Sequence, residues 1–202
     1  VGQIAQPVLA SIQDDKNREF ILTTSPSMDI LVSSNLERLL YLSCGRDAAK
    51  TKELMEQLSK NGKYEITPEM KEFMKDFSAG YADMEENAKE IKKVFDDTGY
   101  LIDTHTGVAA AVYEQYKTKT GDTTKTIIAS TASPYKFSRS VMEAVLGKKE
   151  DADEFALIDE MERISGVKIP QAIEEIRDAK ILHNRQCKPE EMEETVKQTF
   201  SK

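Results

Sequence analysis

Hydroxyl side chains gather at one point of the chain, where Ser130, Thr131 and Ser133 follow the apolar centre of the segment Lys125–Ser130. That segment, KTIIAS, predicts a short buried strand, because its middle is too apolar for a surface helix. In open α/β sheets, ligands bind outside the carboxyl ends of strands. Ser130 and Thr131 therefore stand where a binding site is expected. The alternative is that these hydroxyls only satisfy a turn and cap the next helix.

Two predicted helices flank this strand and turn. The first covers 105–117, where Val108, Ala109, Val112, Tyr113 and Tyr116 form one apolar face. Gly107 and the three alanines at 109–111 keep that helix narrow, which permits close approach to a neighbour. The second helix begins with Ser133 as the cap and Pro134 in its first turn, and ends near Gly147.

The rest of the chain predicts a helical scaffold. Capping residues, proline at helix starts and glycine at helix ends predict a helix between the cap at 33–35 and Gly45, helices over 47–61, 83–98 and 152–165, one that begins after the cap at 67–69, a short segment after 170, and a final helix that begins at 188–190. Phe73, Met74 and Phe77, and then Ile91, Val94 and Phe95, recur at helical spacing, which is typical of core residues rather than of cofactor contacts.

The predicted fold class is α/β, dominated by helices. Arg18–Thr24 is a second, weaker strand candidate, so the chain offers very few neighbours for the strand at 125–130. A buried strand needs neighbours on both sides. We therefore expect that the partner strands belong to a longer polypeptide, and that the unpaired edges favour self-association.

Composition excludes several classes of function. The 202 residues include 39% hydrophobic residues, enough for a core, and the formal net charge is -8 with dispersed basic residues, which argues against nucleic-acid and anionic-membrane partners. No apolar run is long enough to span a bilayer, and no basic flank precedes the apolar part of the N-terminus, so we expect a cytoplasmic protein.

Cys44 and Cys187 are too few for a disulfide framework. His183 and Cys187 have i, i+4 spacing but no second pair, so no metal site is predicted.

Several long motifs resemble the C-terminal portion of bacterial threonine synthase. They are SPSMDILVSSNLERLLY, GKYEITPEMKEFMKDFSAGYADMEENAKEIKKVFDDTGYLIDTHTGVAAAVYEQY and TIIASTASPYKFSRSVMEAV, in the order that the family has them. The likeness runs from about Arg18 onward. It implies that residues 18–202 are the C-terminal part of a catalytic region of fold type II, with a helical insertion at 46–99. Residues 1–17 do not resemble the family at the corresponding place.

The resemblance implies an enzyme that uses pyridoxal phosphate. The family converts O-phosphohomoserine and water into threonine and phosphate, as a carbon–oxygen lyase acting on phosphates in threonine biosynthesis. The family's Schiff-base lysine lies in an N-terminal segment, and its phosphate-binding loop reads G-N-F-G-N; neither motif occurs in this chain. These two parts hold and activate the cofactor. We therefore expect this chain alone to be inactive and to bind no cofactor without the N-terminal part.

The resemblance also assigns residues to the site. Thr131 matches the hydroxyl that hydrogen-bonds the pyridine nitrogen in this fold type, with Ser130 beside it as a second cofactor contact. A neutral hydroxyl leaves that nitrogen largely unprotonated and moderates the electron sink. His105 could contact the substrate phosphate or serve in proton transfer, and Lys136 could pair with an anion. The family usually has proline where Thr104 stands, which leaves the local turn less defined.

A second interpretation needs no catalysis. The helices between Asp47 and Thr98 would form a protein-docking surface, and the hydroxyl turn would be capping alone. The enzyme interpretation requires an upstream region that carries the lysine and the glycine-rich loop. The helical interaction module requires the 202-residue chain to be complete.

Overall fold

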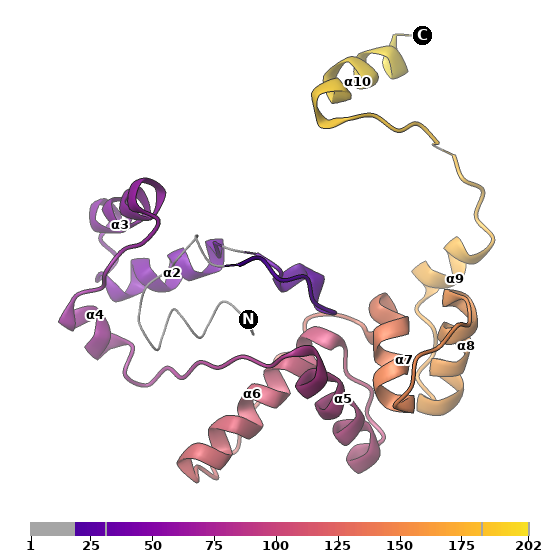
Figure 1. The fold of residues 1–202 in the computed structure, drawn as a ribbon, viewed down its shortest axis with the longest axis horizontal. Helices are drawn as coiled ribbons and strands as arrows, with labels where there is room; N and C mark the ends of the chain where they lie inside the picture. The colour runs from indigo at the N-terminus through magenta and orange to yellow at the C-terminus, as the bar shows by residue number, and fades with distance from the viewer. Residues whose placement is uncertain (1–18, 31, 183, 202) are drawn as a thin grey trace. The chain divides into compact units, whose positions relative to one another are not determined.

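The computed structural model describes residues 19–30, 32–182 and 184–201, and it divides into two units, Val1–Lys168 and Ile169–Lys202. The predictions that fall on residues 1–17, on Arg18 and on His183 lie outside the described residues. Figure 1 shows the order of the elements, and helices are the only regular elements in the described part. No helix in that part combines the length and the apolar character needed to cross a membrane.

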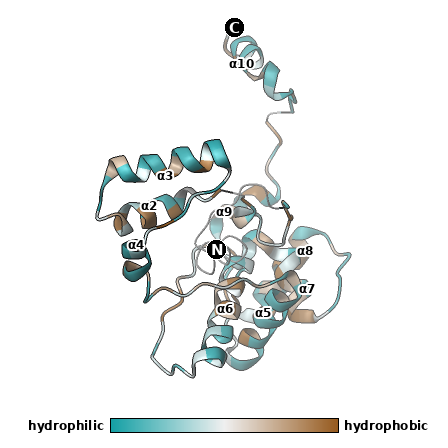
Figure 2. Cartoon of the chain, turned by 60° about the vertical axis from the view of Figure 1, so that its left-hand side comes forward, coloured by the Kyte–Doolittle hydropathy of each residue, from teal (hydrophilic) through white to brown (hydrophobic). Residues whose placement is uncertain are grey.

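Three helices of the first unit share one hydrophobic core. They are α2 (Ser34–Ser43), α3 (Ala48–Asn61) and α4 (Pro68–Phe73), and α2 contacts both of the others. Figure 2 shows hydrophilic and hydrophobic residues alternating along α3, as a helix with one buried face requires. The buried side chains of this core are Leu40, Leu54, Leu58, Tyr64, Ile66, Met70 and Met74.

The predicted core role of Phe73 and Phe77 is wrong. Their exposed fractions are 46% and 50%, and the two rings stack on each other with centroids 6.4 Å apart. Met74, between them, is buried at 4% exposure. The helix ends at Phe73, so the helical spacing that would place all three residues on one face does not continue.

Four more helices belong to the first unit. They are α5 (Met84–Thr98), α6 (Thr104–Thr120), α7 (Ser138–Leu146) and α8 (Glu154–Ser165). Helix α5 packs against both α6 and α7, and α7 packs against α8. The short 3-10 helices η1 (Pro26–Met28) and η2 (Pro134–Phe137) lie in the connecting segments. The second unit contains α9 (Gln171–Arg177), η3 (Pro189–Glu191) and α10 (Met192–Phe200).

The predicted strands do not occur in the described residues. Lys125–Ser130 has no regular secondary structure, and the side chain of Ile127 is 93% exposed instead of buried. Residues 19–24 also form no strand. A strand is stabilised by hydrogen bonds to a neighbouring strand, and the described part of the chain supplies no neighbour. The α/β prediction is therefore confirmed only in its helical part.

The partly buried carboxyl group of Glu90 makes the stability of this packing depend on pH. Glu90 on α5 is only 12% exposed at its side chain; burial raises its pKa, Glu114 adds to the rise, and Lys93 opposes it at an Nζ–Oε1 distance of 3.9 Å. An acid with a raised pKa in the folded state destabilises that state once the pH exceeds both pKa values.

Glu90→Gln should therefore raise the melting temperature of the intact protein at about pH 7. The gain should disappear at about pH 3, where the carboxyl group is protonated in the folded and unfolded states. Thermal unfolding at the two pH values measures the difference. Glu85→Gln, on the exposed face of the same helix, is the control. An equal gain at both pH values would contradict the assignment to burial of the charge.

Candidate active site at the start of α6

A fully buried carboxylate begins α6. Asp103 is the N-cap residue with 0% exposure, and its Oδ1 accepts hydrogen bonds from the backbone N–H groups of His105 at 2.8 Å and Thr106 at 3.4 Å. Its Oδ2 accepts a hydrogen bond from the hydroxyl of Thr106. The sequence Asp-Thr-His-Thr ahead of a small-residue helix explains the local geometry, because aspartate is a preferred cap. The cap also brings two side chains of the first turn to one carboxylate.

His105 is held by this carboxylate and by an aromatic ring. Its Nδ1 lies 3.1 Å from Oδ1 of Asp103, and its ring centroid lies 4.7 Å from that of Phe137 with the planes tilted by 52°. The side chain is 9% exposed. Its second nitrogen, Nε2, is buried and has no hydrogen-bond partner within the described ranges. This nitrogen therefore has an unused hydrogen-bonding capacity, and His105 is one of the residues that line the cavity described below.

The hydroxyl of Ser130 joins the same group through Thr106. The two side-chain oxygens are 3.0 Å apart. Because Thr106 donates its only hydroxyl proton to Asp103, its oxygen is the acceptor in the contact with Ser130. Ser130 must then donate its own proton to Thr106, and it remains available as an acceptor only. The order of donors is Ser130 to Thr106 to Asp103.

An open cavity of ≈ 620 Å³ lies beside this group, a size typical of small-molecule sites. Thr131 lines it, and its hydroxyl makes no hydrogen bond to any other described residue. At the far part of the lining, Tyr116 donates a hydrogen bond of 2.9 Å to Oδ2 of Asp122, which raises the pKa of Tyr116. The lining residues are Met28, Asp76, Ser78, His105, Thr106, Ala109, Val112, Tyr113, Tyr116, Asp122, Thr124, Thr126, Ile127, Ile128, Ala129 and Thr131.

The four candidate residues from the sequence are not all brought together. His105 and Thr131 line one cavity, and Ser130 reaches His105 through Thr106 and Asp103. Lys136 is exposed in η2, does not line that cavity, and has its Nζ 6.0 Å from the centroid of the Phe137 ring.

Sequence reasoning missed two residues of the group, Asp103 and Thr106. The available signal was the cap spacing, which places the carboxylate next to the first turn.

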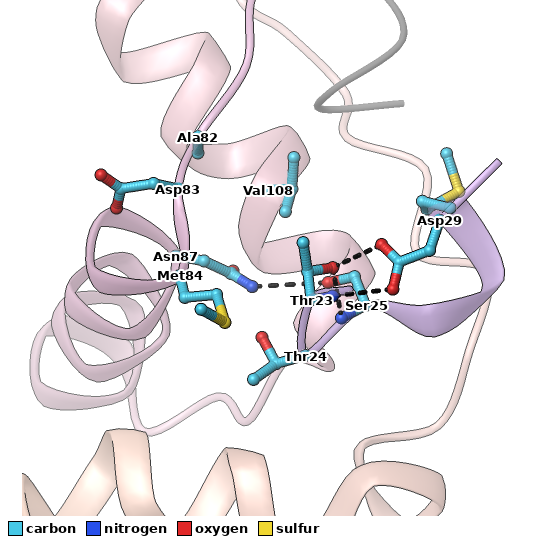
Figure 3. Close-up of a pocket in the computed structure, with 10 residues that line it drawn as sticks. Thr23, Thr24, Ser25, Asp29, Ala82, Asp83, Met84, Asn87 and Val108 are labelled. Carbon is cyan, nitrogen blue, oxygen red and sulfur yellow. Dashed lines mark hydrogen bonds between the residues drawn. The ribbon is translucent and has the colours of Figure 1, made fainter. Parts of the chain in front are cut away.

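A second, small cavity shows how the preceding segment is fixed to α6. Figure 3 shows Ser25 between Asn87 and the start of α6; its hydroxyl donates a hydrogen bond of 3.0 Å to the backbone oxygen of Thr104. Asp29 accepts hydrogen bonds from the backbone N–H and the hydroxyl of Thr23, at 2.8 and 2.7 Å. The cavity holds ≈ 20 Å³, about the size of one water molecule, so it excludes an amino-acid substrate. The hydrogen bond from Ser25 to Thr104 holds the preceding segment against the N-terminus of α6.

These features outline a candidate site, and comparison with known proteins shows what the chain is similar to. The family model "Threonine synthase, C-terminal" matches residues 106–198. Human Threonine synthase-like 1 is 35% identical over 133 residues, which is 65% of this chain and 18% of that protein. Threonine synthase of Saccharomyces cerevisiae is 31% identical over 187 residues, 84% of this chain and 36% of the yeast protein.

Solved structures agree with the sequence matches. The crystal structure of threonine synthase from Brucella melitensis with bound PLP, pyridoxal phosphate, superposes with a TM-score of 0.62 at 30% identity, over 80% of this chain and 38% of the other. This chain thus spans between about a fifth and about two fifths of the proteins that it matches. The resemblance in the sequence is confirmed: the chain is similar to the C-terminal portion of threonine synthase.

Proposed function

We propose that the whole protein is a threonine synthase that converts O-phosphohomoserine and water into threonine and phosphate. The observation that carries the proposal is the match to yeast threonine synthase over 84% of this chain at 31% identity. The buried polar group at the start of α6 and the adjoining cavity support it, because they provide a partly buried site of suitable size for a small polar molecule. The expected partners are this substrate and the N-terminal part of the same polypeptide.

The side chains at the cavity fit pyridoxal phosphate. The hydroxyl of Thr131 has no hydrogen-bond partner among the described residues and lines the cavity, so it can donate a proton to a ring nitrogen. Ser130 would contact the cofactor as an acceptor, because its proton goes to Thr106. When bound, the cofactor supplies an electron sink for chemistry at the amino-acid substrate. A neutral hydroxyl at the nitrogen keeps that sink moderate.

The remaining residues would act on the substrate. The buried Nε2 of His105 has no hydrogen-bond partner among the described residues. A polar substrate that reaches this nitrogen can supply one. Lys136 is exposed, and we propose it as an anion partner that approaches the substrate only when the N-terminal part of the enzyme completes the site. The catalytic lysine and the phosphate loop would come from that part.

We also propose an architecture and a cellular location for the whole protein. Residues 18–202 would form the C-terminal part of a catalytic region of fold type II, with the helical insertion at 46–99. The extended segment at 125–130 would pair with strands of the N-terminal part, which would cover the exposed side chain of Ile127. Without that part, the uncovered edge would favour self-association. The family's role in amino-acid biosynthesis suggests a cytoplasmic enzyme.

The full-length protein should release phosphate and form threonine when O-phosphohomoserine and pyridoxal phosphate are supplied. The present chain alone should do neither, and should show no cofactor absorbance after excess cofactor is removed, because the catalytic lysine lies elsewhere. Phosphate release, threonine analysis and visible absorbance measure these outcomes. A stable lysine adduct of this chain with the cofactor would contradict the division of roles. An inactive full-length protein would favour the helical interaction module.

A further inference from the structure

The carboxylate of Asp103 does more than cap a helix. Asp47 and Asp153 cap α3 and α8 with the same pair of backbone hydrogen bonds, and both are exposed. Asp103 is fully buried, it accepts a further hydrogen bond from the hydroxyl of Thr106, and its Oδ1 lies 3.1 Å from Nδ1 of His105. Burying a carboxylate is costly unless it is fully hydrogen-bonded. A cap alone does not require that cost, as the two exposed caps demonstrate.

The contact with Asp103 fixes which nitrogen of His105 carries the proton. An ionised carboxylate only accepts hydrogen bonds, so the 3.1 Å contact between Nδ1 and Oδ1 is a hydrogen bond in the tautomer whose Nδ1 carries the hydrogen. The hydroxyl of Thr104 is the other group near Nδ1, at the longer distance of 3.4 Å. In the neutral ring, Nε2 is then a bare acceptor. The tilted ring of Phe137 packs on the imidazole and restrains its rotation. Asp103 and Phe137 thus fix the orientation of the imidazole ring and of its Nε2.

The buried Nε2 lacks a hydrogen-bond partner in the described part of the chain, although His105 lines the large cavity. Leaving a buried polar atom unpaired costs about 1–3 kcal/mol. A ligand whose O–H or N–H group reaches Nε2 removes that cost. An unprotonated phosphate oxygen does not, because a bare nitrogen cannot donate to it.

We propose that Asp103 is a positioning residue that holds His105 with Nε2 as the proton acceptor for a water molecule or another hydroxyl donor in the cavity. The role of that water rests on the proposed function, whose reaction consumes water. As the O–H bond of water breaks, its electron pair stays on oxygen and the proton binds Nε2. The resulting imidazolium keeps its Nδ1–H on the carboxylate of Asp103, which remains ionised. Of the two roles that the sequence left open for His105, this selects proton transfer over phosphate binding.

Nitrogen NMR of the full-length protein, labelled with ¹⁵N-histidine, tests the tautomer directly. The His105 signals are assigned by their loss in His105→Gln. We expect the Nδ1–H form in the neutral ring of the wild-type protein. Asp103→Asn should shift the tautomer population, because an amide can also donate to Nδ1, and should lower kcat by about 10²-fold with a much smaller change in KM. Asp153→Asn, the matched exposed cap, should change neither the tautomer nor kcat.

Each outcome decides one question. An Nε2–H tautomer in the wild-type protein overturns the proposal, and so does an Asp103→Asn variant that keeps both the tautomer and kcat. If that variant does not fold, the wild-type tautomer and the kcat of His105→Gln decide instead; an unchanged kcat in His105→Gln overturns the proposal. A wild-type protein with no threonine synthase activity refutes the proposed function, whereas the NMR tautomer still reports on the Asp103–His105 pair.

Discussion

Under the proposed function, Thr131→Val in the full-length protein should lower turnover by about 10-fold to 10²-fold and shift the absorbance of the bound cofactor. Valine has nearly the shape of threonine, so the fold should be retained. The loss is the hydroxyl proton, which would otherwise be donated to the ring nitrogen; an unpaired buried acceptor costs about 1–3 kcal/mol, which corresponds to this range of rates. Steady-state kinetics and visible absorbance of the purified enzyme measure the two effects.

Two variants control for this experiment. Thr126→Val removes a hydroxyl from the same extended segment, but this hydroxyl already donates to the backbone oxygen of Thr124 at 3.0 Å, so the absorbance should not change. Ser130→Ala should lower turnover less than Thr131→Val, because the proton of Ser130 is directed to Thr106. An enzyme with unchanged rate and absorbance after Thr131→Val would remove Thr131 from the cofactor site.

Gly107→Ala should destabilise the protein by about 1–3 kcal/mol, the usual cost of overpacking. Glycine to alanine within a helix normally stabilises by about 1 kcal/mol. At this position a Cβ atom would lie 2.2 Å from Oδ1 of Asn87 and 2.7 Å from Cγ1 of Ile91, both on the facing helix α5. The helices must therefore separate or the two side chains must move. Urea unfolding of the intact protein gives the change in the free energy of unfolding.

Thr118→Ala, at an exposed position of the same helix, should change the free energy of unfolding by no more than about 0.5 kcal/mol. Gly107→Ala combined with Asn87→Ala should recover part of the loss, since the shortest contact is removed. Activity should fall together with stability, because α6 carries the Asp103–His105 pair in its first turn. A Gly107→Ala variant that is more stable than the wild-type protein would disprove close packing of the two helices.

The sequence by itself determined most helix boundaries. Thr67 caps α4, Asp83 and Glu86 form a capping box at α5, and Gly62 and Gly99 end α3 and α5 in the left-handed conformation. Each feature depends on residues within four positions of one another, so local spacing was enough to predict it. For the helix predicted at 105–117, the prediction that Val108 lies on the buried apolar face is confirmed.

Tertiary structure alone decided the contacts between distant residues. The sequence pattern at 125–130 predicts a strand. A strand also needs a partner strand, whose position in the sequence is not set by local pattern. The described residues supply no such partner strand. In the same way, no local spacing links Ser130 to Thr106, or His105 to Phe137; folding brings each pair together across more than twenty residues. The helices follow from short-range backbone hydrogen bonds, whereas the site depends on long-range packing that local patterns do not encode.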